Sequence, residues 1–329
     1  MGVYSRELLF GLAQAHPESR FLYCYRPHRL LKSLAERHPW NARRRLLSYE
    51  RQPRADVFHG LNQRVEYTRK TVPTVVTFHD LFVLSGDYSS KGFRQDFAKR
   101  AIEAAERADL IIAVSQFTAS QIEANLKVPE SRLRVISHGT RPPAGVPPRD
   151  DVRENVILHV GAIQKRKNII RLVEAFEGID SSWRLVLAGA ASGWQSEQAL
   201  ARIEASPARS RIEVIGYVAD AELEQLYRRA RLFAFPSLDE GFGIPVIEAM
   251  ARGVPVLTSN RSALPEAAGG AALLVDPLDV SAIAGGLTHL TEDTGLRDEL
   301  RVKGIARAMS MTWERAVEQT WNVYRELLP

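Results

Sequence analysis

The segment FPSLDEGFGIPVIEAMARGVPVLTSNRSALPEAAG, residues 235–269, decides the fold. It overlaps the apolar run RLFAFP at 231–236, which is typical of a buried strand, and continues into a loop that contains Gly241 and Gly243. A helix is expected directly after this loop, because Pro245 suits a first helical position and apolar residues follow it. The segment therefore predicts a strand, a glycine loop and a helix N-terminus in succession.

The loop and the helix start suit an oxygen-rich or anionic ligand. Gly241 and Gly243 let a ligand approach the backbone, and the first N–H groups of a helix lack internal partners and favour negative charge. Glu240 and Glu248 are eight positions apart, so we expect both to flank one crevice and to accept hydrogen bonds from sugar hydroxyls. The structural alternative is that Glu248 complements the helix dipole while Glu240 is a solvated loop residue.

The pattern E-G-F-G-x-P-x-x-E, followed by A-x-A-x-G-x-P-V and L-P-E, resembles the E-x7-E signature of retaining glycosyltransferase family 4. This family includes bacterial group 1 mannosyltransferases and has the GT-B fold, with two facing Rossmann-like domains. The resemblance implies that Glu248 binds the ribose hydroxyls of a nucleotide-sugar donor. It also implies that Glu240, a catalytic residue, holds the donor sugar and phosphate together with the backbone of Gly241, Phe242 and Gly243.

A second group of candidate residues follows the strand-like run NVILHVG at 155–161. The sequence AIQKRKN comes next and precedes a helix that should begin near Ile169. Lys165, Arg166 and Lys167 would then lie beside exposed N–H groups and form a basic cradle for a diphosphate. The alternative is a solvated charge run, which is the usual meaning of three consecutive basic residues.

This second group also resembles the family, through the pattern V-G-x-x-x-x-R-K-N. The resemblance implies that Gly161 contacts the donor and that Arg166 and Lys167 bind its pyrophosphate. Ala162 stands where some members have another phosphate-binding Arg. Phosphate binding is therefore expected to depend on the Arg166–Lys167 pair.

Further candidates rest on the same resemblance. Tyr217 and Val218 correspond to the loop that lies along the nucleotide base. His79 ends the apolar strand TVVTF and corresponds to a histidine that contacts the donor sugar, so it is the second catalytic candidate. His59 resembles part of an acceptor-side loop, and His138 resembles the interdomain turn. For each histidine the alternative is a satisfied structural residue.

Composition excludes several other classes of protein. The chain has 329 residues, 45% hydrophobic and 25% charged, as expected for a globular protein with two domains. The single Cys24 cannot form an internal disulfide, and neither a basic-then-apolar leader nor an apolar run of about eighteen residues is present. A cytoplasmic setting is therefore expected. The sequence has no dinucleotide or P-loop motif and no Cys/His metal set, so we expect no metal and no cofactor beyond the sugar-nucleotide co-substrate.

Strand-like and helical runs alternate along the chain, which predicts doubly wound parallel α/β domains. The proline-rich stretch 141–151 should divide them. We expect an acceptor-side domain at 1–143, a nucleotide-sugar domain at 152–311, and a helix at 312–329 that packs back across both. A helix at 5–16 opens the chain, whereas family members begin with a strand and a glycine-rich loop, so the first domain is expected to lack its first strand. The expected strands are at 21–25, 56–60, 73–80, 108–115, 133–139, 155–161, 183–189, 211–217, 231–237, 254–259 and 271–277.

The positive charge is concentrated in the first half of the chain. Residues 1–150 carry 24 Lys and Arg against 15 Asp and Glu, and the remainder carries 20 against 24. This asymmetry predicts contact with an anionic membrane surface, although a solvated basic face is the alternative. The basic and apolar residues concerned are Arg26, Arg29, Lys32, Arg37, Arg43, Arg44 and Arg45, with Leu30, Leu31, Leu34, Trp40, Leu46 and Leu47.

Together the motifs predict a retaining glycosyltransferase. It would transfer a hexose, of mannose or glucose type, from a nucleotide diphosphate sugar to a glycan or lipid-linked acceptor in polysaccharide or glycolipid biosynthesis. Nucleic acid is not expected as a partner. Two alternatives stay open: a catalytically impaired nucleotide-sugar-binding or partner subunit, and a GT-B epimerase that acts on the nucleotide sugar.

Overall fold

The computed structural model describes residues 2–47, 54–65, 70–141, 143 and 145–328. Contacts divide the chain into two compact units. The C-terminal helix groups with the first unit, and a short segment from the first half groups with the second. The first unit is Met1–Leu84, Lys91–Gly139 and Thr312–Pro329, and the second is Ser85–Ser90 and Thr140–Met311.

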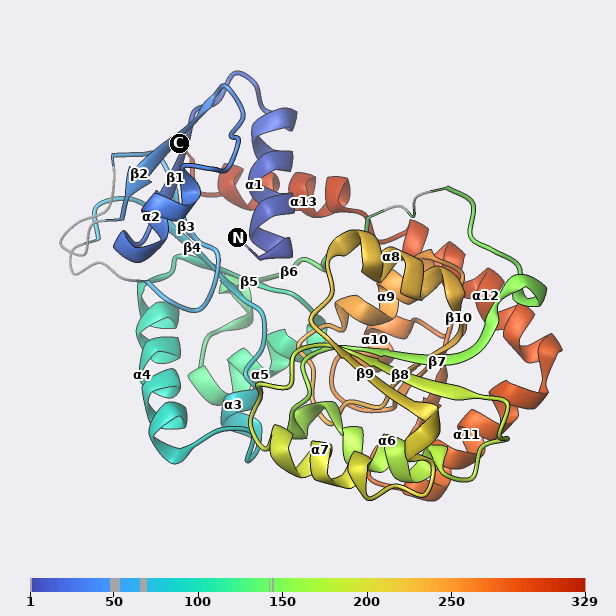
Figure 1. Cartoon of the computed structure of the whole chain (residues 1–329). Helices are drawn as coiled ribbons and strands as arrows, with labels where there is room; N and C mark the ends of the chain where they lie inside the picture. The colour runs from blue at the N-terminus through green and yellow to red at the C-terminus, as the bar shows by residue number, and fades with distance from the viewer. Residues whose placement is uncertain (1, 48–53, 66–69, 142, 144, 329) are drawn as a thin grey trace. The chain divides into compact units, whose positions relative to one another are not determined.

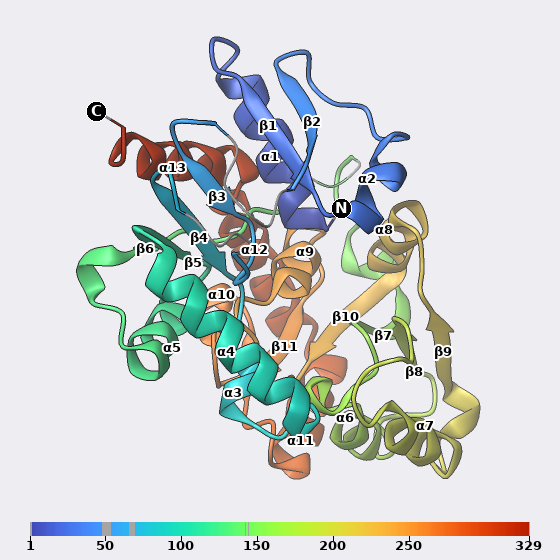
Figure 2. The ribbon, with the colours of Figure 1, turned by 90° about the vertical axis from the view of Figure 1, so that its left-hand side faces the viewer.

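The first unit contains two separate parallel sheets where one was expected. One sheet has two strands, β1 and β2, and the other has the order β3-β4-β5-β6 (Figures 1 and 2). The sequence did not predict β2, because its run ARRRL lacks the apolar residues typical of a strand. The strands are β1 (Phe21–Tyr25), β2 (Ala42–Leu46), β3 (Phe58–Gly60), β4 (Thr74–Phe78), β5 (Leu110–Ala113) and β6 (Leu133–Val135).

Helices cover both faces of the four-stranded sheet. On one face Ala101 of α4 and Ile122 of α5 pack with Val76, and on the other Trp313 of α13 packs with Val75. No strand precedes α1 among the described residues. The helices are α1 (Val3–Ala15), α2 (Pro27–Ser33), α3 (Phe82–Ser85), α4 (Lys91–Arg107), α5 (Gln116–Leu126) and α13 (Trp313–Arg325).

The second unit is one doubly wound sheet with the strand order β12-β11-β10-β7-β8-β9, all parallel. Later strands are added on opposite sides of β7, so the order reverses between β7 and β10. In such sheets ligands bind outside the carboxyl ends of the strands at this reversal. The strands are β7 (Glu154–Val160), β8 (Arg184–Ala188), β9 (Ile212–Gly216), β10 (Ala230–Phe235), β11 (Val256–Ser259) and β12 (Leu273–Val275).

Figure 1 shows the second sheet between α6, α7 and α11 on one face and α8, α9 and α10 on the other. Both faces are apolar, as expected for a buried parallel sheet. Short 3-10 turns lie at Glu130–Arg132, Asp150–Val152, Lys165–Lys167 and Arg209–Arg211. The helices are α6 (Ile169–Phe176), α7 (Ser196–Glu204), α8 (Asp220–Arg229), α9 (Ile244–Ala251), α10 (Leu264–Ala268), α11 (Val280–Glu292) and α12 (Thr294–Met309).

Candidate functional site

The two predicted motifs meet at the reversal of strand order in the second unit. The basic segment 165–167 follows β7, and the loop 236–243 follows β10, its neighbour in the sheet. Because parallel strands end at the same edge, the two loops lie together. The topology thus brings both predicted motifs to one place.

Glu240 joins the motifs by forming ion pairs with two basic residues. Arg166 Nη1 lies 2.5 Å from Glu240 Oε2, and Lys167 Nζ lies 2.6 Å from Glu240 Oε1. Arg166 also donates to the backbone oxygen of Asp239 at 2.8 Å. Lys167 is 6% exposed and Glu240 7%. The three charged side chains, here called the charge triad, form a mostly buried cluster with one net positive charge.

The pKa of Glu240 follows from this pairing. Burial alone would raise it, but Arg166 and Lys167 outweigh burial and lower it to about 2. Glu240 is therefore a carboxylate at neutral pH and cannot donate a proton. It is not the solvated loop residue of the structural alternative.

His159 of β7 lies next to the Phe235 ring that the charge triad contacts. Burial, with the charge of Lys167, lowers the His159 pKa to about 4, so the imidazole is neutral. Its Nδ1 lies 3.0 Å from the backbone oxygen of Ala234, and its ring stacks on Phe235. Lys167 Nζ lies 4.5 Å from the centre of the same Phe235 ring. The Lys167 ammonium thus lies against the face of an aromatic ring that stacks on a neutral imidazole.

The backbone around the triad differs from our expectation. We predicted exposed N–H groups beside the basic residues, but Lys167 N–H donates to Gln164 and Asn168 N–H donates to Lys165. Asn168 has a φ of 60° and its side chain donates to the carbonyls of Pro236 and Pro277. Charged side chains, not these two amides, therefore offer binding groups to an anion.

The predicted glycines have identifiable packing roles. A Cβ on Gly161 would lie 3.2 Å from Lys167 Cε, so Gly161 leaves room for the lysine stem. Gly243 precedes α9 with a φ of 106°, a backbone conformation that other residues rarely adopt. Gly241 and the buried Phe242 complete the loop between Glu240 and Gly243.

Glu248 lies in α9 with its own set of contacts. Tyr227 Oη is 3.3 Å from Glu248 Oε2, and Arg252 donates to the Glu248 backbone oxygen while pairing with Glu224 at 2.7 Å. Burial raises the Glu248 pKa, and Arg252 opposes this rise. The structure thus gives Glu240 and Glu248 different partners and opposite pKa shifts.

The predicted base-side loop begins at Gly216, which has a φ of 84°. Tyr217 is 84% exposed, whereas Val218 packs partly against the core. An exposed aromatic ring beside a partly buried valine offers a flat surface to a planar ligand.

His79 lies in the first unit, after β4. Its Nε2 is 2.9 Å from the backbone oxygen of Leu61, its Nδ1 is 3.4 Å from His138 Nε2, and the Tyr4 ring meets it edge-on. Burial lowers the pKa of His79, so the ring is neutral at pH 7. A neutral imidazole donates one hydrogen bond and accepts another.

His59 lies in β3, within the strand expected at 56–60. Its Nδ1 is 2.6 Å from Tyr324 Oη and its Nε2 is 2.8 Å from Thr77 Oγ1. Burial is the main cause that lowers its pKa to about 3. Its two ring nitrogens therefore join α13 to β4, which is a structural role.

Comparison with known proteins assigns most of the chain. Residues 147–307 match the family described as glycosyl transferases group 1, and residues 8–142 match glycosyltransferase family 4. The chain is 32% identical to O-antigen chain mannosyltransferase B of Escherichia coli, over 82% of its own length and 74% of that protein. It belongs to glycosyltransferase family 4.

The resemblance predicted from the E-x7-E pattern is therefore confirmed, and the chain is a glycosyltransferase. It is also 28% identical to the E. coli serotype-specific mannosyltransferase WbdA over 82% of its length, and the match spans only 36% of WbdA. A crystal structure of Anabaena Alr3699/HepE with UDP and glucose superposes with a TM-score of 0.75 at 18% identity, covering 99% of this chain and 96% of that one. The predicted GT-B fold is confirmed.

Within its described residues, this glycosyltransferase has no helix that is both long and apolar enough to span a membrane. The same residues hold no cluster of three or more His, Cys, Asp or Glu side chains suited to a metal ion.

The sequence did not predict that Asp239 would bind the segment Ser85–Ser90. Ser85 Oγ donates to Asp239 Oδ2 at 2.6 Å, and Lys165 Nζ lies 3.4 Å from Asp87. Burial raises the pKa of Asp239. The acidic pair D-E before the glycine loop was a signal for Asp239, but no local pattern links it to a segment more than 140 residues earlier.

Proposed function

We propose that this family 4 glycosyltransferase transfers a hexose, of mannose or glucose type, from a nucleoside diphosphate sugar to a glycan or lipid-linked acceptor with retention of configuration. The charge triad carries this proposal. Its two cations share one carboxylate in a buried setting, so a net positive charge faces whatever anion enters. A diphosphate has the charge and the paired oxygens that a guanidinium and an ammonium bind best.

The environments of Glu240 and Glu248 favour a transfer mechanism that forms no covalent glycosyl-enzyme intermediate. Retaining glycosidases use two carboxyl groups, one as acid and one as nucleophile. Glu240 is held ionised between two cations, and Glu248 contacts Tyr227. We infer that the donor's leaving phosphate, neutralised by Arg166 and Lys167, takes the acceptor proton, as the family resemblance implies.

Roles for the remaining residues are carried over from the family resemblance. Glu248 accepts hydrogen bonds from the ribose, and the exposed Tyr217 lies along the base with Val218. His79 is assigned to the donor sugar, where its neutral ring can donate or accept a hydrogen bond. The names of the relatives support the choice of hexose: one is a mannosyltransferase, and one structural neighbour holds UDP and glucose.

We further propose that the acceptor side approaches an anionic membrane. Apolar side chains in the segment 26–47 are strongly exposed beside arginines: Trp40 is 83% exposed and Leu31 77%. Such a mixture suits the interface of a membrane that presents anionic headgroups. The side chain of Lys32 lies outside the described part of this segment.

The test of the transferase function is a panel of GDP- and UDP-hexoses. Calorimetry should find one nucleotide sugar that binds, and incubation with lipid-linked glycan acceptors should yield a product whose anomeric configuration matches the donor, as read by NMR. Inversion would contradict the retaining mechanism. Binding without transfer to any acceptor would favour the impaired subunit, and interconversion of the free sugar nucleotide would favour the epimerase.

A second arm tests the assignment of the triad. Lys167→Ala should weaken binding of the nucleoside diphosphate by about tenfold or more while leaving the bare nucleoside nearly unchanged, because a charge-assisted hydrogen bond is lost only for the phosphate. Lys303→Ala, an exposed lysine on α12, is the matched control. Equal weakening of nucleoside diphosphate and nucleoside binding would show that Lys167 does not bind the phosphates.

A further inference from the structure

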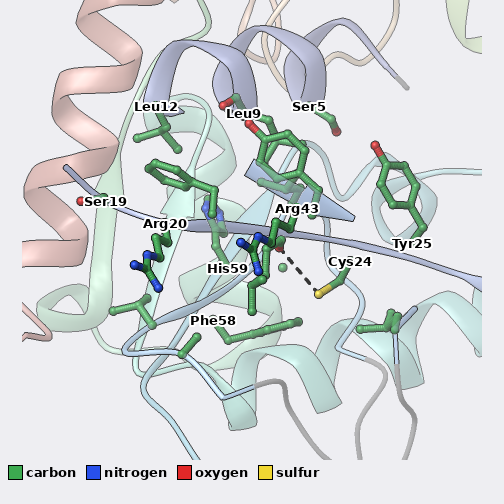
Figure 3. A pocket seen from close by; sticks show the side chains of 18 of the residues that line it. Ser5, Leu9, Leu12, Ser19, Arg20, Cys24, Tyr25, Arg43, Phe58 and His59 are labelled. Atoms are coloured by element: carbon green, nitrogen blue, oxygen red, sulfur yellow. Dashed lines mark hydrogen bonds between the residues drawn. The ribbon is translucent and has the colours of Figure 1, made fainter. Parts of the chain in front are cut away.

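The loop after β3 lies between two cavities of the first unit. The larger cavity encloses about 1860 Å³, and Figure 3 shows Phe58 and His59 of β3 among the side chains that line it. The smaller cavity, here called the α4 pocket, encloses about 90 Å³ and lies between the loop and the first half of α4. The α4 pocket is lined by aromatic, charged and amide side chains, which are Gln63, Arg64, Phe93, Asp96, Phe97 and Arg100.

The spacing of residues along α4 explains how the pocket forms. Phe93, Phe97 and Arg100 recur at intervals of four and three, so they lie on one face of the helix. Farther along the helix, Ala101 and Ala104 are fully buried in the core of this unit. Phe97 packs partly against the same core, whereas Phe93, one turn earlier, is 50% exposed. The face of α4 thus passes from core to solvent within the pocket.

The two phenylalanines present ring surface to a ligand. Their ring centroids are 6.5 Å apart and their planes are inclined by 33°. Because Phe97 is anchored in the core, the pair has one fixed ring and one exposed ring. One face of a pyranose sugar carries C–H bonds and packs against aromatic rings of this kind. A sugar ring would cover the apolar surface that Phe93 exposes to water.

The polar side chains of the α4 pocket match the hydroxyl groups of a sugar. Gln63 both donates and accepts hydrogen bonds, Asp96 accepts them, and Arg64 and Arg100 donate them. Sugar hydroxyls also donate and accept, so a pyranose can use all of these groups. A phosphate ion bears negative charge, and the Asp96 carboxylate would repel it. The lining therefore favours a neutral sugar over an anion.

The pocket lies at the edge of the four-stranded sheet where ligands are expected. The loop that contains Gln63 follows the carboxyl end of β3, and Phe93 lies in the first turn of α4, which follows β4. Ligands of parallel α/β sheets bind outside the carboxyl ends of the strands. His79 Nε2 lies 2.9 Å from the backbone oxygen of Leu61 in the same loop. The pocket thus adjoins the residue that we assign to the donor sugar.

We propose that the α4 pocket binds one pyranose residue of the glycan acceptor. The sugar packs on Phe93 and Phe97, and its hydroxyls bond to Gln63, Asp96 and Arg100. Enclosed small-molecule sites usually measure about 300–1,000 Å³, so a pocket of about 90 Å³ holds a single sugar residue while the rest of the glycan lies outside. The identity of the sugar as an acceptor rests on the proposed function, whereas the binding of a sugar does not.

The first arm of the experiment measures sugar binding without donor or transfer. Saturation-transfer NMR is recorded on the full chain with the methyl α-glycosides of mannose, glucose, galactose and N-acetylglucosamine. Phe93→Ala removes an exposed ring, and Ile102→Ala, a 45% exposed residue of the same helix outside the pocket, is the matched control. The signal of at least one glycoside should fall about fivefold in Phe93→Ala, because the stacking surface is lost, and should persist in Ile102→Ala.

The second arm measures transfer with the same proteins. The KM for the glycan acceptor should rise about fivefold in Phe93→Ala, while donor affinity by calorimetry stays unchanged. Arg100→Ala should also raise this KM, and Lys99→Ala, an exposed neighbour on α4 that does not line the pocket, should not.

The outcomes separate this proposal from the proposed function. Equal saturation signals in Phe93→Ala, Ile102→Ala and the unmodified protein, or no signal in any of them, would overturn the sugar site. Displacement of the glycoside by an equal concentration of inorganic phosphate would overturn it as well, because the arginines would then bind an anion. Saturation that depends on Phe93, with no transfer by any of the proteins, would support the sugar site and contradict the transferase function alone.

Discussion

Glu248, the proposed ribose ligand, is a buried carboxyl group that lowers the stability of the fold at neutral pH. Burial raises its pKa, so the carboxylate costs folding free energy at neutral pH, and that cost is removed as the pH falls through the raised pKa. We expect Glu248→Gln to melt a few degrees higher than the unmodified protein at pH 7, and the difference to shrink near pH 4.

The same substitution should weaken donor binding by about 1.5–3 kcal/mol, because hydrogen bonds from the ribose to a charged acceptor are lost. Calorimetry and melting curves on one preparation measure both effects. Glu222→Gln, an exposed change on α8, is the control and should alter neither. Unchanged donor affinity in Glu248→Gln would remove Glu248 from the ribose site.

For His79 we expect a loss of turnover that is larger than the loss of stability. His79→Ala removes the hydrogen bond to the Leu61 carbonyl, worth about 1 kcal/mol, and the longer contact with His138. Turnover should fall at least about tenfold if the ring contacts the sugar during transfer. Steady-state kinetics and melting curves decide between the two roles: a large drop in melting temperature with normal turnover would make the histidine structural.

At the residue scale, sequence reasoning was strongest where a motif fixes both spacing and chemistry. It placed Glu240, Arg166 and Lys167 in one site, and the structure brings these three side chains together. It assigned the carboxylate and the two cations separately to the ligand, however, and did not predict their mutual ion pairs. Lys167 and Glu240 are 73 residues apart in the sequence. The pairing of the strands brings their side chains together, and no local sequence pattern encodes that pairing.

At the scale of elements, the strands with apolar runs were predicted and the exposed, basic strand β2 was missed. β4 lies within the segment expected for it, and β10 begins one residue before its expected segment. β2 was missed because Arg43, Arg44 and Arg45 have the composition of a solvated loop. The parallel pairing with β1 makes this run a strand, and pairing partners are not encoded locally.

The strand β2 sharpens the membrane prediction. Arg43, Arg44 and Arg45 are all exposed, but Arg44 also donates to the carbonyls of Ser33 and Glu36 and therefore has a structural role. We expect Arg43→Ala with Arg45→Ala to weaken binding to anionic vesicles by about 2 kcal/mol, since each charge near the surface contributes about 1 kcal/mol.

The measurement is co-sedimentation with phosphatidylglycerol and phosphatidylcholine vesicles at low and high salt. Lys303→Ala on α12 should bind like the unmodified protein. Negligible binding of the unmodified protein to both vesicle types would leave the arginines as a solvated face.

At the scale of the whole molecule, the chain is two units with separate cores. The proline-rich stretch 141–151 was the feature of the sequence from which we expected two domains. The sequence did not predict that Ser85–Ser90 would group with the second unit or that the first would hold two sheets. Both features depend on which edges meet in space. The alternation of strands and helices along a sequence predicts the class of the fold, but it does not predict which strand edges pair.

The charge triad makes the stability of the second unit depend on acid. Burial opposes ionisation of Glu240, but its two cations lower the folded pKa to about 2, against an ordinary value of 4.5. A carboxylate with a depressed pKa contributes stability that is fully present above the ordinary value and is lost as the pH falls toward the folded one. This difference corresponds to roughly 3 kcal/mol.

We therefore expect hydrogen exchange in β7 and β10 to accelerate between about pH 4.5 and 2, after correction for intrinsic rates. Glu240→Gln leaves two buried cations without a counter-charge, which should cost about 3–5 kcal/mol at neutral pH and remove this contribution to the acid dependence. Glu213→Gln, an exposed change on β9, should keep the profile of the unmodified protein. If Glu240→Gln and the unmodified protein lost protection in parallel over this range, the acid sensitivity would have to arise from carboxylates outside the triad.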